Sequence, residues 1–386
     1  MTPQARMELA KIVSERYLKA KTKSEKTKIL DEFCANTGHN RKYAITKIRE
    51  ICFKQKQPKK RGRKAKYSKE ADALLIQIWK SFDKICGERL HPFLPEALAV
   101  LKRFGYIKYH YGIQKEVLNM SCSTIKRRIR SERRKNDRML ACTTKPGKWL
   151  KHEIPIKTNQ WNEDKAGNGE IDLVAHCGGS LLGEFIYTLQ YVDIKTTWTE
   201  RKAVMGKGQD RVFIAIKKIR TQLPFDLLGL DSDNGNEFIN HQLFKYCQKE
   251  GIAFSRSRPY MSKDNAHIEQ KNGSLVRNVL GYDRFDTLKH LELINNLYDN
   301  ELRLFLNFFQ PSLKLKQKIR VGAKYKRKYD TAKTPYQRVL DCPDIPQERK
   351  NKLLHLYHSL NPIQLKHQID FKIRNIVSLR SGFLMN

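Results

Sequence analysis

Short apolar runs separated by turn residues occupy the middle of the chain and predict an α/β domain there. Three runs rich in β-branched and aromatic residues predict consecutive strands: GEIDLVAHC, FIYTLQYVDI and TTWTERKAVM. Beyond them helices and short strands alternate, in the order RVFIAIKKIRTQL (helix), DLLGLDSD (strand), EFINHQLFKYCQKEG (helix), IAFSRSR (strand) and AHIEQKNGSLVRNVL (helix). Three strands in series, followed by this alternation, predict a mixed sheet covered by helices.

The first 56 residues have helical periodicity and predict a helix-turn-helix DNA-binding unit. Ser24 is expected to cap one helix, and a turn signal at residues 36–38 separates it from a second helix that starts at Asn40. The second helix carries basic residues around an apolar stripe of Tyr43, Ile45 and Ile48. A basic second helix is typical of units that enter the major groove, although a helical hairpin with a solvated basic face fits the same pattern.

Residues 68–135 repeat this pattern and predict a second helix-turn-helix unit. A short helix, a turn near residues 119–121 and a strongly basic helix follow one another. Ser121 or Ser123 is expected to cap the basic helix. Ile125 and Ile129 are spaced so that they face inward.

The composition of the remaining segments predicts two linkers and a basic C-terminal region. Residues 57–67 form a basic low-complexity linker, which is also expected to act as an arm in the narrow minor groove. Residues 136–167 have few periodic apolar positions and predict a second linker before the core at 168–290. Residues 291–386 form a helical and basic C-terminal region. It contains two predicted helices, LELINNLYDNELRLFLNFF and residues 346–360, and the run FKIRNIVSL, which fits a strand.

The charge balance points to a polyanionic partner. Lys and Arg number 76 and Asp and Glu 40, so the formal net charge is +36 at pH 7. A membrane surface is the rival polyanion, but no apolar run approaches the roughly 20 residues of a spanning helix. The start of the chain lacks the apolar core of a secretory signal, so we expect a cytoplasmic protein. The eight cysteines include no CxxC pair, and we expect free thiols rather than a zinc site.

Three acidic residues stand out in this basic chain: Asp172 in GEIDLVAH, Asp233 in LDSDNGNEF and Glu269 in DNAHIEQKN. Between the first two lie 60 residues, and between the last two 35. Carboxylates are the ligands that hard divalent cations prefer, and two such cations about 4 Å apart can activate both ends of a phosphodiester displacement. A turn role for Asp233, a helix-start role for Glu269, and Asp231 in place of Asp233 are the open alternatives.

Residues 168 to about 285 resemble the catalytic core of retroviral integrases and of the related bacterial insertion-sequence transposases. The segments SDNGNEF and SKDNAHIEQKN resemble the family's second-Asp and Glu motifs. Two later segments, NFFQPSLKL and KTPYQRVL, resemble segments beyond the core of some of these transposases. The resemblance implies an RNase H-like fold with an Asp, Asp, Glu triad, and it selects Asp233 over Asp231. Gly273 and Val276 stand where retroviral integrases carry DNA-contacting lysines. The expected substitutes are Lys271, Asn272 and Arg277.

The same resemblance implies a DNA transposase that nicks inverted-repeat ends and transfers the strand, using two Mg²⁺ (or Mn²⁺) ions. Asp172, Asp233 and Glu269 are then both the catalytic residues and the metal ligands. The implied partners are double-stranded DNA, as element ends and as target, and further copies of the chain in a homo-oligomer, with no membrane. The implied location is the cytoplasm of a bacterium, in association with the nucleoid. Two alternatives stay open: a catalytically dead, transposase-derived DNA-binding regulator, and a structure-specific nuclease.

The predicted DNA contacts are basic residues on the two basic helices, the arm, the core and the C-terminal basic stretch: Arg41, Lys42, Lys47, Arg61, Arg63, Lys126, Arg127, Arg128, Arg130, Lys271, Lys326 and Arg327. Such phosphate contacts predict a steep loss of affinity with salt. Near the triad, His267 is expected either to orient a phosphate or to start a helix, and Asn265 either to contact DNA or to fix the loop. Trp198 is expected to pack in the core or at the edge of the sheet rather than to stack on a base.

Overall fold

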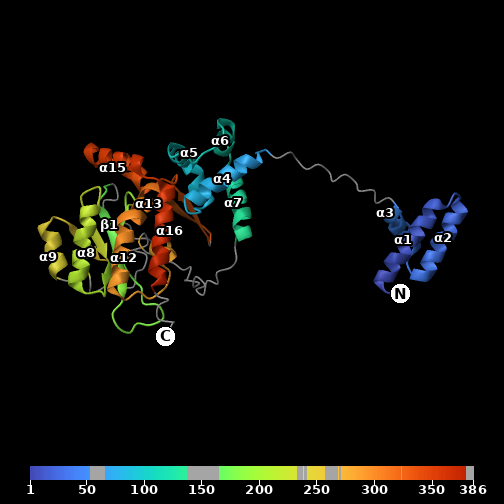
Figure 1. Cartoon of the computed structure of the whole chain (residues 1–386), viewed down its shortest axis with the longest axis horizontal. Coiled ribbons are helices and arrows are strands. Elements are labelled where there is room, and N and C mark those ends of the chain that lie inside the picture. The colour runs from blue at the N-terminus through green and yellow to red at the C-terminus, as the bar shows by residue number, and fades with distance from the viewer. Residues whose placement is uncertain are drawn as a thin grey trace. The chain divides into compact units, whose positions relative to one another are not determined.

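The computed structural model describes residues 1–52, 66–136, 165–232, 238, 241–256, 268, 271–322 and 324–379. The chain forms two compact units, Met1–Lys66 and Tyr67–Asn386 (Figure 1). Nearly all of the two predicted linkers lies outside the described residues. The same holds for some residues predicted to act in the site or on DNA: Arg61, Arg63, Asp233, Asn265, His267 and Glu269.

Three helices make up the first unit: α1 (Pro3–Lys19), α2 (Lys23–Thr37) and α3 (Arg41–Cys52). They enclose a small apolar core formed by Ala10, Val13, Ile29, Leu30, Phe33, Ala44 and Ile48. Gly38 ends α2 with a φ of 70°, a left-handed conformation that glycine adopts without strain. At the start of α3 the side chain of Asn40 accepts a hydrogen bond from the Lys42 amide at 2.8 Å. The unit therefore contains the predicted helix, short turn and basic helix.

Two details of this unit differ from the prediction. Thr22, and not Ser24, caps α2, because the Thr22 hydroxyl accepts from the Glu25 amide at 3.2 Å while the Glu25 carboxylate accepts from the Thr22 amide at 3.3 Å. This reciprocal cap requires Glu or Gln three residues after the cap, which Ser24 lacks. Tyr43 is also not part of the buried stripe: it is 49% exposed, and Ala44 takes the buried position.

The second unit begins with four helices: α4 (Lys69–Ser81), α5 (Gly87–Arg103), α6 (Tyr111–Leu118) and α7 (Cys122–Asn136). Ser121 is the residue whose hydroxyl accepts from the amide of Thr124, at 3.3 Å, at the start of α7. Ile125 and Ile129 are buried, as their spacing predicts. Helices α6 and α7, with the three residues between them, reproduce the second predicted helix–turn–basic helix pattern.

Five strands form the central sheet: β1 (Asn168–Ala175), β2 (Ile186–Asp193), β3 (Thr199–Met205), β4 (Gly229–Ser232) and β5 (Ala253–Arg256). Their order is β3-β2-β1-β4-β5. Strand β2 is antiparallel to both β1 and β3, whereas β4 is parallel to β1 and β5 is parallel to β4. Helices α8 (Gln209–Gln222) and α9 (His241–Lys249) precede β4 and β5. This arrangement confirms the predicted mixed sheet and the RNase H-like fold class.

The rest of the second unit is mostly helical: η1 (Asn272–Arg277) and η2 (Tyr298–Leu302), both π-helical, α11 (Asn278–Leu280), α12 (Leu288–Leu297), α13 (Arg303–Phe309), α14 (Pro335–Asp341), α15 (Gln347–Ser359) and α16 (Pro362–Ser378). A hairpin of β6 (Leu315–Val321) and β7 (Lys324–Tyr329) interrupts them. The strand prediction for FKIRNIVSL was wrong. That run lies in α16, which Asn361 caps and which buries Leu365, Ile369 and Ile376 at helical spacing.

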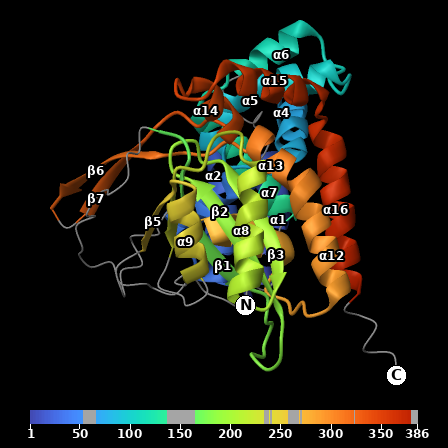
Figure 2. The same cartoon turned by 90° about the vertical axis from the view of Figure 1, so that its left-hand side faces the viewer.

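Two apolar cores hold the second unit together. One joins α4–α7 with α12–α16, and the other lies between the sheet and helices α8 and α9 (Figure 2). The predicted boundaries near residues 135, 167 and 290 therefore fall inside one compact unit. No helix in the described part of the chain combines the length and the apolarity that a membrane span requires.

Candidate active site

The two faces of the central sheet differ in chemistry. On one face, apolar side chains pack with α8 and α9: Ile171, Leu189, Tyr191 and Val204. Because successive strand residues point to opposite faces, the residues between them lie on the other face. There the cross-strand register lines up Asp172, Gln190 and Arg201 in one row. We call this second face the polar face for its central row, although Ile186 and Ala203 near one end of it belong to the larger apolar core.

Asp172 lies within the central strand β1, on the polar face, and is partly buried. Its Oδ2 accepts a hydrogen bond from Nδ2 of Asn272 at 2.6 Å. Asn272 opens η1 and stands three residues after Glu269 in the sequence. The Oδ1 atom of Asn272 is buried, with no hydrogen-bond partner among the described residues. A carboxylate beside an unused amide oxygen is a pair of hard oxygen donors, and this chemistry fits Mg²⁺ or Mn²⁺.

Asp233 and Glu269 lie outside the described residues, but the residue just before each of them is described. Ser232, at the end of β4, pairs with Ile171 in the parallel register. The Ile268 amide donates to Oε2 of Glu170 at 2.8 Å, and Glu170 is itself buried. Both flanking residues thus contact β1 within two positions of Asp172.

Other acids near β1 have structural partners. The Oδ1 atom of Asp231, the alternative to Asp233, accepts a hydrogen bond from the Ser255 hydroxyl at 2.6 Å. Asp193 at the end of β2 accepts from the Gly167 amide at 2.8 Å and from the Thr196 amide at 2.7 Å. Burial raises the pKa of Asp193 to about 6. These bonds fix the β2–β3 turn and the strand edges.

The polar face carries a buried cation, Arg201, that the sequence reasoning did not predict. Arg201 is buried, burial lowers its pKa to about 10, and its Nη2 donates to Thr199 Oγ1 at 3.1 Å. Burial also lowers the pKa of Lys271 to about 7, with Arg201 the first of the nearby cations that add to the effect. Lys271 is partly buried, and its contact with DNA stays a prediction. The sequence signal was a set of polar residues at alternate positions in otherwise apolar strands.

His176, directly after β1, is a second feature that sequence reasoning missed. Its Nε2 lies 2.8 Å from Oγ1 of Thr188, which lies 2.8 Å from the hydroxyl of Tyr298. Burial lowers the pKa of His176 to about 3, so the ring is neutral at physiological pH. This buried chain of polar groups joins β1, β2 and η2. Trp198 is buried as predicted, and its Nε1 donates to Glu200 at 2.7 Å.

The residues predicted to contact DNA from the two basic helices differ in exposure and in whether they form ion pairs. On α3, Arg41 pairs with Asp31, whereas Lys42 is exposed and Lys47 is partly buried. On α7, Lys126 pairs with Glu88 at 2.5 Å and Arg128 with Asp72 at 3.0 Å. The two remaining arginines of α7, Arg127 and Arg130, are exposed, as are Lys326 and Arg327 on β7.

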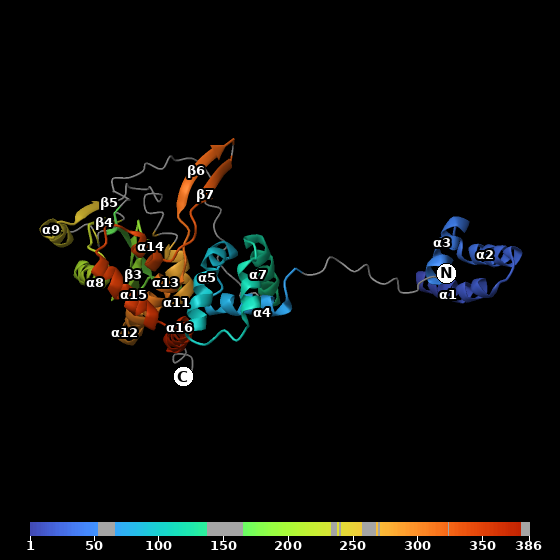
Figure 3. The same cartoon turned by 90° about the horizontal axis from the view of Figure 1, so that it is seen from above.

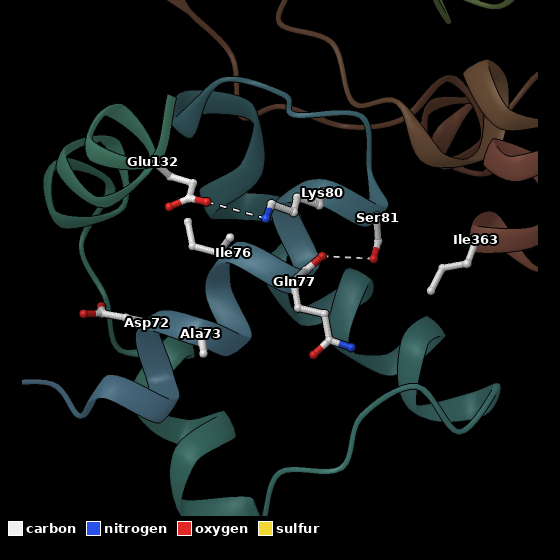
Figure 4. A pocket seen from close by; sticks show the side chains of 8 residues that line it. All are labelled: Asp72, Ala73, Ile76, Gln77, Lys80, Ser81, Glu132 and Ile363. Atoms are coloured by element: carbon white, nitrogen blue, oxygen red, sulfur yellow. Dashed lines mark hydrogen bonds and ion pairs between the residues drawn. The ribbon is translucent and has the colours of Figure 1, made fainter. Parts of the chain in front are cut away.

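A hollow of about 590 Å³ lies on the surface of the second unit, lined mainly by α4 with one residue each from α7 and α16 (Figure 4). It is lined by Asp72, Ala73, Ile76, Gln77, Lys80, Ser81, Glu132 and Ile363. Inside it Lys80 pairs with Glu132 at 3.5 Å and the Ser81 hydroxyl donates to the Gln77 carbonyl at 3.0 Å. Asp172, the described member of the predicted triad, is not among the lining residues. Over the described residues, no group of three or more His, Cys, Asp and Glu side chains could hold a metal ion.

Comparison with known proteins gives one relative along most of the chain. A protein of Sinorhizobium fredii (strain NBRC 101917 / NGR234), described as "Uncharacterized protein y4rM", is 34% identical over 342 residues, spanning 88% of this chain and 95% of that protein. No protein-family profile matches the chain.

Among solved structures the chain is similar to retroviral integrase catalytic cores. The core of BIV integrase is 18% identical and covers 46% of this chain and 95% of its own, with a TM-score of 0.31. The core of HTLV-2 integrase, solved in complex with magnesium in a dimeric form, is 15% identical and covers 38% and 90%, with a TM-score of 0.29. TM-scores near 0.3 do not establish a fold, so the fold class here rests on the strand order and directions.

Proposed function

The chain belongs to the family of the Sinorhizobium fredii protein y4rM, and we propose that it is a DNA transposase that nicks the ends of an insertion sequence and transfers the strand. The observation that carries the proposal is the position of Asp172. It lies on the polar face of the sheet, and the described residues that precede Asp233 and Glu269 both contact its strand. This supports a shared site for the three carboxylates.

The chemistry follows from the ligands. Two Mg²⁺ or Mn²⁺ ions, held by Asp172, Asp233 and Glu269, would supply the positive charge that activates the attacking oxygen and neutralises the leaving 3′-oxygen. Asn272 holds Asp172 in one orientation through its 2.6 Å hydrogen bond. Arg201, two strands away from Asp172 in the same row, adds positive potential to this face, which favours a phosphodiester there. Nicking by water and joining by a 3′-hydroxyl are the same displacement, so one site serves both without a covalent protein intermediate.

Recognition of DNA is assigned to the two helix–turn–helix patterns. In α2–α3 the turn is short and α3 presents Lys42 on its exposed surface. In α6–α7 the ion pairs of Lys126 and Arg128 tie α7 to its own bundle, while Arg127 and Arg130 are exposed. We assign the phosphate contacts of α7 chiefly to these two exposed arginines. A homo-oligomer on DNA fits an enzyme that must handle two element ends.

The test compares two aspartates that are two residues apart. Purified protein is given labelled duplexes that carry the inverted repeats flanking the coding region, with Mg²⁺. Asp233→Asn should abolish nicking but leave binding of the ends intact, because it removes a metal ligand and not a DNA-binding surface. Asp231→Asn is the matched control: its side-chain oxygen can still accept from Ser255, so nicking should persist.

Three results would overturn the proposal. Nicking by Asp233→Asn at the wild-type rate would remove Asp233 from the site. Wild-type protein that binds the repeats but never nicks them in Mg²⁺ or Mn²⁺ would indicate a DNA-binding regulator. Equal cutting of branched DNA without the repeats would indicate a structure-specific nuclease instead.

A further inference from the structure

The hairpin β6–β7 forms a two-stranded ribbon that stands apart from both cores of the second unit. Figure 3 shows it projecting away from the helices and from the central sheet. Every described side chain from residue 315 to residue 329 is exposed, including Ile319 at 45%, Val321 at 61% and Tyr325 at 43%. A two-stranded hairpin that buries neither face is only marginally stable in water by itself. Its shape must therefore be supported from its base or by a partner.

The base of the ribbon is firmly attached. Asp330, just after β7, accepts from the Lys314 amide at 2.7 Å and forms an ion pair with Arg338 of α14, also at 2.7 Å. Arg338 in turn donates to the Ser312 carbonyl at 2.9 Å. The side chains of Asp330 and Arg338 are only 12% and 11% exposed, so this pair is shielded from solvent. The two strands thus leave the body of the protein in a fixed direction.

The ribbon itself carries only positive charge. Residues 315–329 contain seven Lys and Arg residues and no Asp or Glu. No ion pair joins the described side chains of this segment to any other described group. The acid that directly follows the segment in the sequence, Asp330, is already paired with Arg338. Like charges on both faces repel one another and cannot be neutralised within the ribbon. A polyanion is the partner that this surface fits.

The dimensions of the ribbon favour the major groove of duplex DNA. A two-stranded ribbon fits the major groove of duplex DNA, which is about 12 Å wide, but not the minor groove, which is about 6 Å wide. The seven residues of β6 span roughly 23 Å at about 3.3 Å per residue, enough to lie along the groove between the two phosphate backbones. The register places Ile319 opposite Lys326 and Arg320 opposite Tyr325, so each face presents a cation beside an apolar or aromatic group.

We propose that residues 315–329 enter the major groove of duplex DNA as a preformed ribbon, oriented by the Asp330–Arg338 pair at its base. The proposal rests on the proposed function in taking DNA as the substrate. It does not need an active catalytic site, because it concerns binding alone. An acidic protein on the ribbon would be the other kind of partner, and the experiment below separates the two.

The experiment measures the affinity of the full-length protein for a short duplex as a function of salt. The ribbon variant is Lys326→Gln/Arg327→Gln, and the control is Lys289→Gln/Lys352→Gln, which removes the same charge from exposed residues of α12 and α15. The ribbon variant should lower the slope of log affinity against log salt by about two and weaken binding about tenfold or more at 0.1 M salt. The control should change neither value to a comparable extent.

The groove is tested with a duplex whose major groove is filled by glucosylated hydroxymethylcytosine. If the ribbon occupies that groove, the ribbon substitutions should cost no further affinity on the filled duplex. If they cost as much there as on plain DNA, the ribbon contacts phosphates or the minor groove, and the groove assignment is overturned. Equal DNA binding by the ribbon and control variants overturns the DNA partner and leaves an acidic protein.

Asp330→Asn distinguishes the orienting role of the Asp330–Arg338 pair from the effect of net charge on DNA binding. The substitution makes the protein more positive, so charge alone predicts tighter DNA binding. Loss of the ion pair with Arg338 instead frees the ribbon, so we expect weaker binding by several-fold, with Glu at the same position restoring part of the affinity. Tighter binding by Asp330→Asn would overturn the orienting role. Wild-type protein that fails to bind any duplex would instead overturn the proposed function.

Discussion

The two faces of the central sheet use the same strands for opposite purposes. Ile171 and Leu189 point to one face and are buried in an apolar core with α8 and α9. Asp172 and Gln190, their neighbours in the sequence, point to the other face, where hydrogen bonds and charges dominate. Burying polar groups costs free energy unless they are paired, so the polar face is retained at the expense of stability. The comparison predicts that substitutions on one face remove stability and those on the other remove activity.

The largest expected effect comes from Asp172→Asn on the polar face. Loss of a charged metal ligand removes several kcal/mol of transition-state stabilisation, so nicking should fall about a thousandfold or more. The melting temperature should change little, because Asn keeps the size of the side chain. Nicking rates on labelled repeat ends and thermal melts measure both. Asp210→Asn, in the first turn of α8, is the control. A wild-type rate for Asp172→Asn would contradict a catalytic role for this face.

On the apolar face, Leu189→Ala should lower stability and leave the nicking rate nearly unchanged. Leu189 is fully buried, and such truncations cost about 2–5 kcal/mol of unfolding free energy. The nicking rate per folded molecule should stay near wild type at a temperature where the variant is folded. Urea unfolding and nicking at 20 °C below the melting point measure the two effects. Leu181→Ala, at a side chain that is 78% exposed, should leave stability unchanged. A Leu189 variant that is stable but inactive would break the comparison.

Asn272→Ala tests a positioning residue that acts through Asp172. A hydrogen bond to a charged group contributes about 1.5–3 kcal/mol, so the nicking rate should fall about ten- to a hundredfold. The Mg²⁺ concentration for half-maximal rate should also rise, which a purely structural defect would not cause. Asn278→Ala, at an exposed residue farther along the same helical run, is the matched control. An unchanged Mg²⁺ dependence would exclude the positioning role.

The smallest effect concerns pH and His176. The pKa of this ring falls from its ordinary value of about 6.5 to about 3 in the folded protein, because burial disfavours the charged form. The unfolded chain therefore binds the proton first as pH falls, and stability is lost below about pH 6.5. The loss is about 1.4 kcal/mol per pH unit, or roughly 2 kcal/mol between pH 6.5 and pH 5.

In urea titrations at pH 5, 6 and 7.5, His176→Gln should remove this part of the pH dependence. The exposed His355→Gln on α15 should leave it in place. A wild-type pH dependence in the His176 variant would show that the buried ring is not its source.

Much of the fold could be predicted because its signals are local. The three antiparallel strands, the α8–β4 and α9–β5 alternation and the helices of both N-terminal patterns follow from periodicity and turn residues. Trp198 was also predicted to be buried, since a large aromatic residue within a strand pattern usually packs in a core. The prediction of a strand at FKIRNIVSL was wrong because these nine residues are only part of a longer helix. The start signal of that helix, Asn361-Pro362, lies ten residues upstream.

The polar face was harder to predict because it depends on cross-strand register. Periodicity assigns Asp172 to one face of β1, but it does not say which residue of β2 stands beside it. The register of Gln190 between Asp172 and Arg201 depends on the lengths of two hairpins. The hydrogen bond between Asp172 and Asn272 joins residues 100 positions apart. The triad itself was singled out by its spacing, and its joint action stays a proposal.

The π-helical turn η1 has a consequence for how insertions and deletions act on this protein. A π-turn holds one residue more than an α-turn, and each residue of an α-helix advances the helix by about 100°. Deleting a single residue between 273 and 277 would let an ordinary α-turn form with Asn272 still facing the same way relative to α11, whereas deleting a second residue would rotate Asn272 and everything before it by that angle. The number of residues in this short segment, more than their identity, then decides whether the Asn272 amide faces β1.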